Sequence, residues 1–152
     1  MEVNLDIQRE VDALPKDEEI LGWVKEVLTN ERYGDTELTV RFVSKEESAD
    51  LNEQYRNKKG ATNVLSFTFD APDEVEINLL GDLVICSDVV KQQAKEQNKQ
   101  ELAHWAHMIV HGTLHLLGYD HLNDAEANEM ELKEIIILSQ LGYPDPYREI
   151  EA

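Results

Sequence analysis

All five histidines of this chain lie in one short stretch, HWAHMIVHGTLHLLGYDH, which covers residues 104–121. An α-helix has 3.6 residues per turn, so a helix through this stretch would place four imidazoles within a sector of about 80° on one face. These four are His104, His107, His111 and His115. Taken singly, each is typical of a half-buried histidine that donates to a nearby carbonyl group. Taken together, they predict a helix over about residues 99–117 with imidazoles along one side.

Distances along this helix decide which histidines can bind the same metal ion. At a rise of 1.5 Å per residue, His104 would lie about 16 Å from His115, and His107 about 12 Å from it, both too far for a shared ion. Only histidines four residues apart are close enough, because they are neighbours on the helix surface. The possible pairs are therefore His107 with His111, or His111 with His115.

The residues after the helix favour the second pair. Gly118 stands three residues beyond His115, where the chain can leave the helix through a left-handed turn. That turn would bring His121 back to the pair formed by His111 and His115. Three neutral imidazoles leave the fourth position of a tetrahedral zinc ion open, as in catalytic zinc sites. We therefore expect one Zn²⁺ ion per chain, bound by His111, His115 and His121.

The spacing of these histidines resembles the zincin signature H-E-x-x-H-x-x-G-x-x-H, with one difference. Gly112 occupies the position of the zincin glutamate. That glutamate is the general base in peptide hydrolysis, so its absence counts against a peptidase of this type. A zinc-bound water can ionise near pH 7 without a carboxylate, and its attack suits a phosphodiester whose developing charge is stabilised by a nearby cation.

The cation must come from another part of the chain, because no Lys or Arg lies between Gln100 and Leu132. Residues 54–69 contain Arg56, Lys58 and Lys59 and no acidic residue. This run is either a phosphate-binding surface or a solvated helix end, where cations interact favourably with the helix dipole.

The overall charge is strongly negative, −18 at pH 7. An acidic surface repels nucleic acids and anionic lipids, so any polyanion that binds must find a local basic patch. Cys86 is the single cysteine and lies in an apolar run that predicts a buried strand. Without a possible internal disulfide, an export signal or a membrane-spanning run, we expect a cytoplasmic protein with no membrane partner.

The hydrophobic pattern predicts one α/β (α+β) domain over residues 1–152. Its core would be a small, mixed, mostly parallel four-stranded sheet packed by about five helices. The strands are expected at residues 3–9, 36–44, 62–70 and 81–87, the last two as an antiparallel pair. A helix of about 14 residues is expected around EEILGWVKEVL, residues 18–28. Further helices are expected from Ser44 to about Arg56 and from Ser87 almost to the end, with caps at Ser44, Ser87, Asn98 and Asn123.

Two motifs resemble those of a known family. HGTLHLLGYDH and LNEQYRNKKGATNVLSF are similar to the signatures of the YbeY family of bacterial endoribonucleases, and GDLVIC and LGYPDPY fit as well. The resemblance extends from about residue 51 to residue 147. It implies a fold of a small sheet packed by helices, with zinc held in a cleft by His111, His115 and His121. It also implies that Arg56 and His115 are catalytic.

The same resemblance implies a function. The chain would be a single-strand-specific, zinc-dependent endoribonuclease that matures the 3′ end of 16S ribosomal RNA and acts in ribosome quality control. Its partners would be single-stranded RNA, the ribosome or ribosome-associated proteins, but not DNA. Two residues depart from the family pattern: Asn63 replaces a common aspartate, and Lys59 stands where an acid is frequent. Both changes make this region less negative.

Several further residues and two other functions stay open. Asp120 could accept a hydrogen bond from a metal-bound imidazole or cap the turn. His107 lines the cleft or packs beneath it, His104 is more remote, Ser66 and Asp82 are most simply sheet residues, and Met130 is most simply core. A zinc peptidase with its base outside the motif, and a non-enzymatic ribosome-assembly factor with a structural metal, remain as alternatives.

Overall fold

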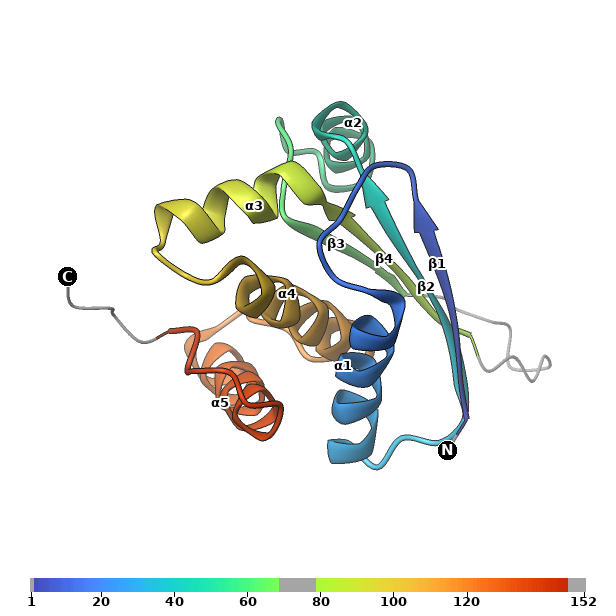
Figure 1. The fold of residues 1–152 in the computed structure, drawn as a ribbon, viewed down its shortest axis with the longest axis vertical. Helices are drawn as coiled ribbons and strands as arrows, with labels where there is room; N and C mark the ends of the chain where they lie inside the picture. The colour runs from blue at the N-terminus through green and yellow to red at the C-terminus, as the bar shows by residue number, and fades with distance from the viewer. Residues whose placement is uncertain (1, 69–78, 148–152) are drawn as a thin grey trace.

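The chain forms a mixed sheet packed by helices, as the pattern predicted, and the helices lie on both of its faces (Figure 1). A computed structural model describes residues 2–68 and 79–147. Phe69 and Asp70 of the third expected strand lie outside these residues, as does most of the connection to the fourth. The strands are β1 (Val3–Arg9), β2 (Thr36–Val43), β3 (Val64–Thr68) and β4 (Leu79–Cys86). The helices are α1 (Asp17–Asn30), α2 (Lys45–Arg56), α3 (Ser87–Glu96), α4 (Glu101–Leu116) and α5 (Asp124–Gln140).

The strand order in the sheet is β1-β2-β4-β3. β1 and β2 are parallel, because α1 returns the chain to the end of the sheet where β1 began. β2 and β4 are also parallel, because β3 runs back along the sheet before β4 begins. β3 runs antiparallel to β4, with Val64 opposite Ile85 and Thr68 opposite Gly81. The predicted mixed, mostly parallel topology is thus confirmed, and β3 lies at an edge of the sheet.

The larger hydrophobic core lies between one face of the sheet and helices α1, α4 and α5 (Figure 1). α4 crosses this face, and α5 packs against α4 and α1. α4 is buried on most of its circumference, which suits its high apolar content. The sheet contributes alternate residues of two central strands to this core, namely Leu38, Val40, Phe42, Leu83 and Ile85.

The other face of the sheet carries a smaller core beneath α2. Val43, Leu65 and Val84 are buried here, and Leu51 of α2 and Phe67 of β3 pack against them. Successive residues of a strand point to opposite faces, so β3 contributes to both cores. This alternation places α2 and α4 on opposite sides of β3.

The helix boundaries were predicted with unequal success. Ser44 and Asn123 are N-caps, accepting hydrogen bonds from the amides of residues 47 and 126 respectively. Ser87 is instead the first residue of α3, one position after the cap. The prediction for Asn98 was wrong: it has a left-handed backbone with φ 56°, and α4 begins three residues later. Asparagine tolerates this conformation, which allows Asn98 to end α3 rather than begin α4.

The end of α4 has the predicted glycine turn. Gly118 has φ 105°, and the amide of Tyr119 donates to the carbonyl of Leu114 at 3.1 Å, which closes the end of the helix. The chain therefore reverses just after His115, and this reversal positions the loop that contains His121.

Close packing between α4 and the sheet requires glycine at two points. A Cβ on Gly112 would lie 2.8 Å from Cδ2 of Leu83 and 3.3 Å from Cγ2 of Val64. A Cβ on Gly81 would overlap the carbonyl oxygen of Phe67, and its φ of 150° also favours glycine. Gly112 therefore points into the main core, away from the open face of α4.

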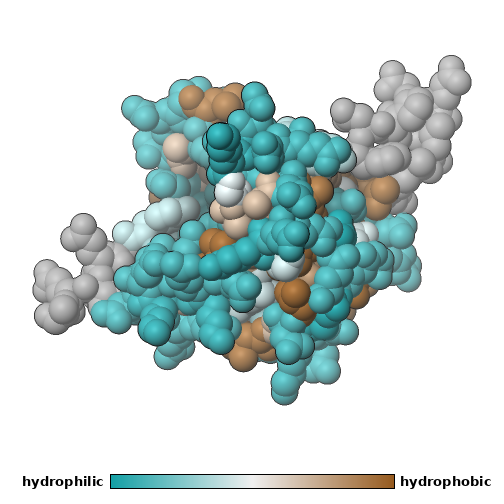
Figure 2. All heavy atoms as spheres, turned by 90° about the horizontal axis from the view of Figure 1, so that it is seen from above, coloured by the Kyte–Doolittle hydropathy of each residue, from teal (hydrophilic) through white to brown (hydrophobic). Residues whose placement is uncertain are grey.

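The surface is mostly hydrophilic in the view of Figure 2, with apolar residues in small separate groups. This matches a chain in which acidic residues outnumber basic ones by 32 to 14. Within residues 2–68 and 79–147, no helix has the length and apolar character needed for a membrane span.

Candidate metal centre

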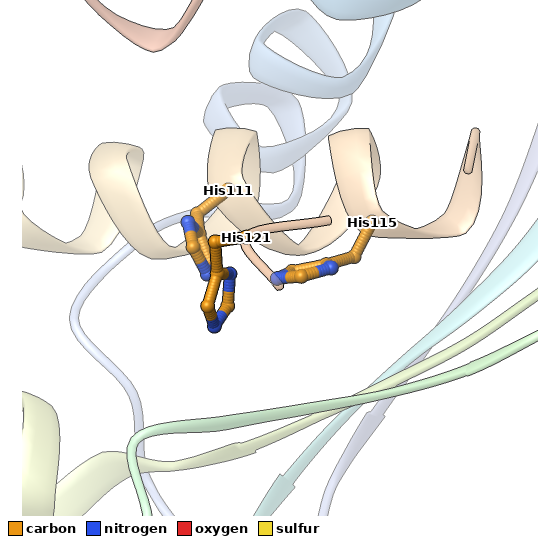
Figure 3. Close-up of side chains that lie close together, drawn as sticks. All are labelled: His111, His115 and His121. Atoms are coloured by element: carbon orange, nitrogen blue, oxygen red, sulfur yellow. The ribbon is translucent and has the colours of Figure 1, made fainter. Parts of the chain in front are cut away.

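Three histidines converge beside the last turns of α4 (Figure 3). His111 and His115 project from adjacent turns of the helix, and His121 comes back to them from the loop after Gly118. The ring centroids are 4.6 Å apart for His111 and His115, 5.1 Å for His115 and His121, and 6.0 Å for His111 and His121. Each residue offers one ring nitrogen such that all three nitrogens lie within 4.8 Å of one another.

This arrangement fits a zinc ion. Zn–N bonds of 2.0–2.1 Å in a tetrahedral site place the ligand nitrogens about 3.3 Å apart, so small ring rotations would bring these three to ligand distance. Burial decreases across the group, since His111 and His115 are half-buried and His121 is exposed. Three neutral nitrogen ligands with one side open to solvent leave room for a further ligand.

Glu134 of α5 lies directly behind His111 and was not found from the sequence. Its carboxylate is fully buried, and its Oε1 accepts hydrogen bonds from Nδ1 of His111 at 2.9 Å and from Nε2 of His107 at 2.8 Å. The hydroxyl of Tyr147 donates to the other oxygen, Oε2, at 2.7 Å. With its Nδ1 proton directed to Glu134, His111 presents Nε2 as its free ligand atom.

These contacts keep Glu134 ionised. Burial acts to raise the pKa of its carboxyl, but the hydrogen bonds from His107 and His111 outweigh burial and lower the pKa to about 2. Burial also lowers the pKa of the His107 imidazole. The structure therefore holds a buried carboxylate anion between the rings of His107 and His111, directly behind one of the three converging histidines.

His115 is also held as a neutral ligand. Burial lowers the pKa of its imidazole, and so do the nearby His111 and His121, while a hydrogen bond to the backbone of Tyr119 and the charge of Asp120 act in the other direction. A ligating histidine commonly gives its second N–H to a backbone carbonyl or a carboxylate. His111 and His115 both have such a partner.

Asp120 has the turn-capping role rather than a visible bond to an imidazole. Its Oδ1 accepts the amide hydrogen of His121 at 2.8 Å. This contact stabilises the loop that brings His121 to the helix, so Asp120 acts through the backbone. Met130 is buried in the core.

Arg56 is exposed at the C-terminal end of α2, on the far side of β3 from the histidines. In the described part of the chain, no hydrogen bond or ion pair joins it to the three histidines. Two consecutive residues of β3 relate the two regions: Phe67 contacts Tyr55, with ring centroids 5.3 Å apart, and the Ser66 hydroxyl donates to the carbonyl of Gly112 at 3.4 Å. Arg56 and the histidine cluster therefore flank the same edge strand.

Lys59 and Asn63, the two residues that depart from the family pattern, lie in the connection between α2 and β3. Asn63 donates from Nδ2 to Oε1 of Gln93 at 3.2 Å, and the same oxygen accepts from Nε2 of His104 at 3.0 Å. Asn63 thus belongs to a hydrogen-bond network that links the residue before β3 to α3 and α4. Lys59 is exposed, and Asp82 is an exposed residue within β4.

The lowered pKa of His104 predicts how the stability of the folded protein changes with pH. Burial lowers the pKa of its imidazole from 6.5 to about 4, with smaller effects in the same direction from His107 and Lys99. The unfolded chain therefore takes up a proton near pH 6.5 that the folded chain takes up only near pH 4. As the pH falls through this window the folded state loses stability, by about 2 kcal/mol from this residue at pH 5, and above it this residue adds no pH dependence.

Urea unfolding of the chelated protein at pH 7.5 and pH 5 would measure this loss. His104→Gln keeps a hydrogen-bonding group but does not titrate, so its stability should fall less between the two pH values. An equal fall in wild type and variant would show that His104 is not the source.

Glu134 and Tyr147 were not identified as site residues from the sequence. The buried positions Met130, Ile137 and Leu138 define the inner face of α5, and Glu134 lies on that same face. A lone acid on an apolar face was the available signal, since buried carboxylates require partners. Tyr147 lies beyond the last helix, and its available signal was its place at the end of the family-like stretch LGYPDPY.

The sequence and the fold are both similar to those of known proteins. The family model described as endoribonuclease YbeY matches residues 4–142. A protein named endoribonuclease YbeY from Alteromonas mediterranea is 56% identical over 134 residues, which cover 88% of this chain and 85% of that protein. The solution structure of TM1509 from Thermotoga maritima aligns with a TM-score of 0.59 and 27% identity, covering 95% of this chain and 99% of the other.

Proposed function

This chain belongs to the YbeY family of endoribonucleases, and from that premise we propose that it cuts single-stranded RNA with the help of one zinc ion. Its substrate would be ribosomal RNA, at the 3′ end of the 16S molecule, in maturation and quality control of the ribosome in the cytoplasm. Residues 1–152 would act as one domain. The observation that carries the metal dependence is the convergence of three imidazoles, two of them with partners that fix their orientation.

In this proposal His111, His115 and His121 hold the zinc ion. When bound, such an ion supplies Lewis-acid chemistry, lowering the pKa of water and neutralising developing charge on a phosphoryl group. The chain's own residues set the ligand geometry: Glu134 orients His111, the turn at Gly118 positions His121, and Asp120 fixes the backbone of that turn. The open side of the group leaves space for a phosphodiester.

Arg56 would hold the negative charge of the RNA backbone. Arg56 is the last residue of α2 and is followed by acid-free residues that include Lys58 and Lys59. The side chains of these three cations are exposed. RNA bound at both regions would pass over the edge strand β3, where Tyr55 of α2 packs on Phe67. A narrow cationic route of this kind suits a protein whose total charge repels nucleic acid, and it favours a flexible single strand over a rigid duplex.

The first test is cleavage of end-labelled single-stranded RNA by the purified protein, with duplex RNA and an unstructured peptide as alternative substrates. Cleavage of the single strand that stops with a chelator and returns with added Zn²⁺ supports the proposal. Chelator-resistant RNA cleavage would contradict zinc dependence. Chelator-sensitive cleavage of the peptide alone would favour the peptidase, and absence of all cleavage would favour an assembly factor.

Arg56→Ala should lower kcat for RNA cleavage by about 10²-fold, because a cation aimed at developing phosphoryl charge contributes that much in typical active sites. Zinc affinity should not change, since Arg56 does not contact the histidines. Lys58→Ala is the matched control, because it also removes an exposed cation from the acid-free run, and it should lower RNA affinity only slightly. Equal effects of the two variants on kcat would indicate general attraction of RNA rather than a specific role for Arg56.

A further inference from the structure

The C-terminal segment after α5 folds back onto the metal centre. Lys99 donates from Nζ to the carbonyl oxygen of Pro146 at 2.6 Å, which fastens the segment to the start of α4. Tyr147 then reaches Glu134 with its hydroxyl, and its ring lies edge-on to the His107 ring with centroids 5.4 Å apart. The segment thus contacts Glu134, which itself contacts His111, but it touches none of the three converging nitrogens.

We propose that Glu134 is a positioning residue that fixes His111 as a zinc ligand through Nε2, and that Tyr147 sets the strength of the site by holding Glu134. This inference rests on the zinc site of the proposed function. It adds the prediction that residues outside the ligand set, including one near the end of the chain, determine metal affinity.

The geometry supports this role for Glu134. Its two oxygens accept three hydrogen bonds of 2.7–2.9 Å, so the carboxylate is fixed in position and the rings that contact it are fixed in turn. A carboxylate that accepts the second N–H of a ligating histidine fixes the tautomer of that histidine and makes it a better ligand. The negative charge of a buried carboxylate also partly balances a divalent cation nearby.

Tyr147 and His107 orient the carboxylate rather than the metal. Without the Tyr147 hydroxyl, Oε2 of Glu134 would lose its partner, and the carboxylate could rotate about its last bond. His107 would remain bonded to Oε1, which leaves part of the arrangement intact. We therefore expect loss of the Tyr147 hydroxyl to weaken zinc binding less than loss of the Glu134 charge.

A second ion at this place is the alternative, because His107, His111 and Glu134 also offer ligand atoms within 4.8 Å of one another. The contacts of 2.8 and 2.9 Å are normal lengths for N–H···O hydrogen bonds. An ion there would have to displace both protons, and His111 would then bind metal through both ring nitrogens. We infer that protons, not a second ion, join these three residues.

The test is the zinc affinity of the metal-free protein, measured by competition with a chromophoric chelator. Tyr147→Phe should weaken binding about 3- to 10-fold and Glu134→Gln about 10- to 100-fold, the range typical of residues that support a metal ligand. Tyr143→Phe is the matched control, because Tyr143 lies in the same segment but packs on Trp23, with centroids 6.2 Å apart, and it should bind zinc as wild type does. Tyr147→Phe in the Glu134→Gln background should weaken binding no further, since the two residues act in series.

Two further readouts separate positioning from general destabilisation. Thermal unfolding of the metal-free variants should remain cooperative. The ¹⁵N shifts of the His111 ring should show a proton on Nδ1 in wild type and a mixture of tautomers in Glu134→Gln, and Glu134→Asp should partly restore both the shifts and the affinity. Wild-type zinc affinity in Tyr147→Phe and Glu134→Gln would overturn this inference alone, as would two zinc ions bound per chain. A wild-type chain that binds no zinc would overturn the proposed metal site as well.

Discussion

Replacing His115 with alanine should lower kcat/KM for RNA cleavage by at least about 10³-fold while the protein stays folded. His115 is the central member of the three converging histidines, with ring centroids 4.6 and 5.1 Å from the other two. Two remaining imidazoles cannot form a tight zinc site, and loss of a catalytic zinc ion removes several kcal/mol of transition-state stabilisation. At about 1.4 kcal/mol per factor of ten, the expected loss is about 10³-fold or more.

The His115→Ala experiment needs one control for folding and one for the loss of a histidine from α4. The side chain of His115 is half-buried and faces the open side of α4, so its removal should leave no unfilled core position. His104→Gln changes a histidine on the same helix outside the ligand group, and it should keep RNA cleavage. Metal content, circular dichroism and cleavage rate should be measured on all three proteins. Unchanged cleavage by a folded, zinc-free His115→Ala protein would remove the metal from the proposed mechanism.

The sequence predicted those parts of the structure that depend on local pattern. Strand alternation and helical spacing are properties of neighbouring residues, so four strands, five helices and the antiparallel β3–β4 pair were all expected before the structure was known. The convergence of His121 with His111 and His115 was also local, because one helix end and one glycine turn determine it. Asn98 was misassigned because asparagine suits both the start of a helix and the left-handed residue at its end.

Contacts between distant segments were not predictable in this way. Glu134 lies 23 residues from His111 in the chain, and no spacing rule relates positions on two separate helices. Tyr147 meets Glu134 in a segment that Lys99, which lies 47 residues before Pro146 in the chain, also binds. The relation of Arg56 to the histidines depends on which face of the sheet each helix covers, and this follows from packing.

Gly112 explains why the zincin glutamate has no counterpart here. In a zincin-type motif the residue after the first histidine faces the substrate, but Gly112 faces the sheet. A Cβ at this position would already lie 2.8 Å from Leu83, whose side chain is fully buried. Glycine therefore allows α4 to approach the sheet closely, which is a reason of packing rather than of catalysis.

Gly112→Glu should consequently unfold the protein instead of creating a peptidase. A carboxylate here would be buried among Leu83 and Val64 without a partner, and unpaired buried charges together with overpacking cost more than about 4 kcal/mol. That loss is a large part of the about 5–15 kcal/mol that stabilise a typical domain. Gly112→Ala is the matched control: its gain of about 1 kcal/mol in helix propensity opposes an overpacking cost of about 1–3 kcal/mol, so the protein should stay folded. Urea unfolding and peptide cleavage would be measured for both, and a folded Gly112→Glu protein that cuts peptides would show that this position faces the substrate after all.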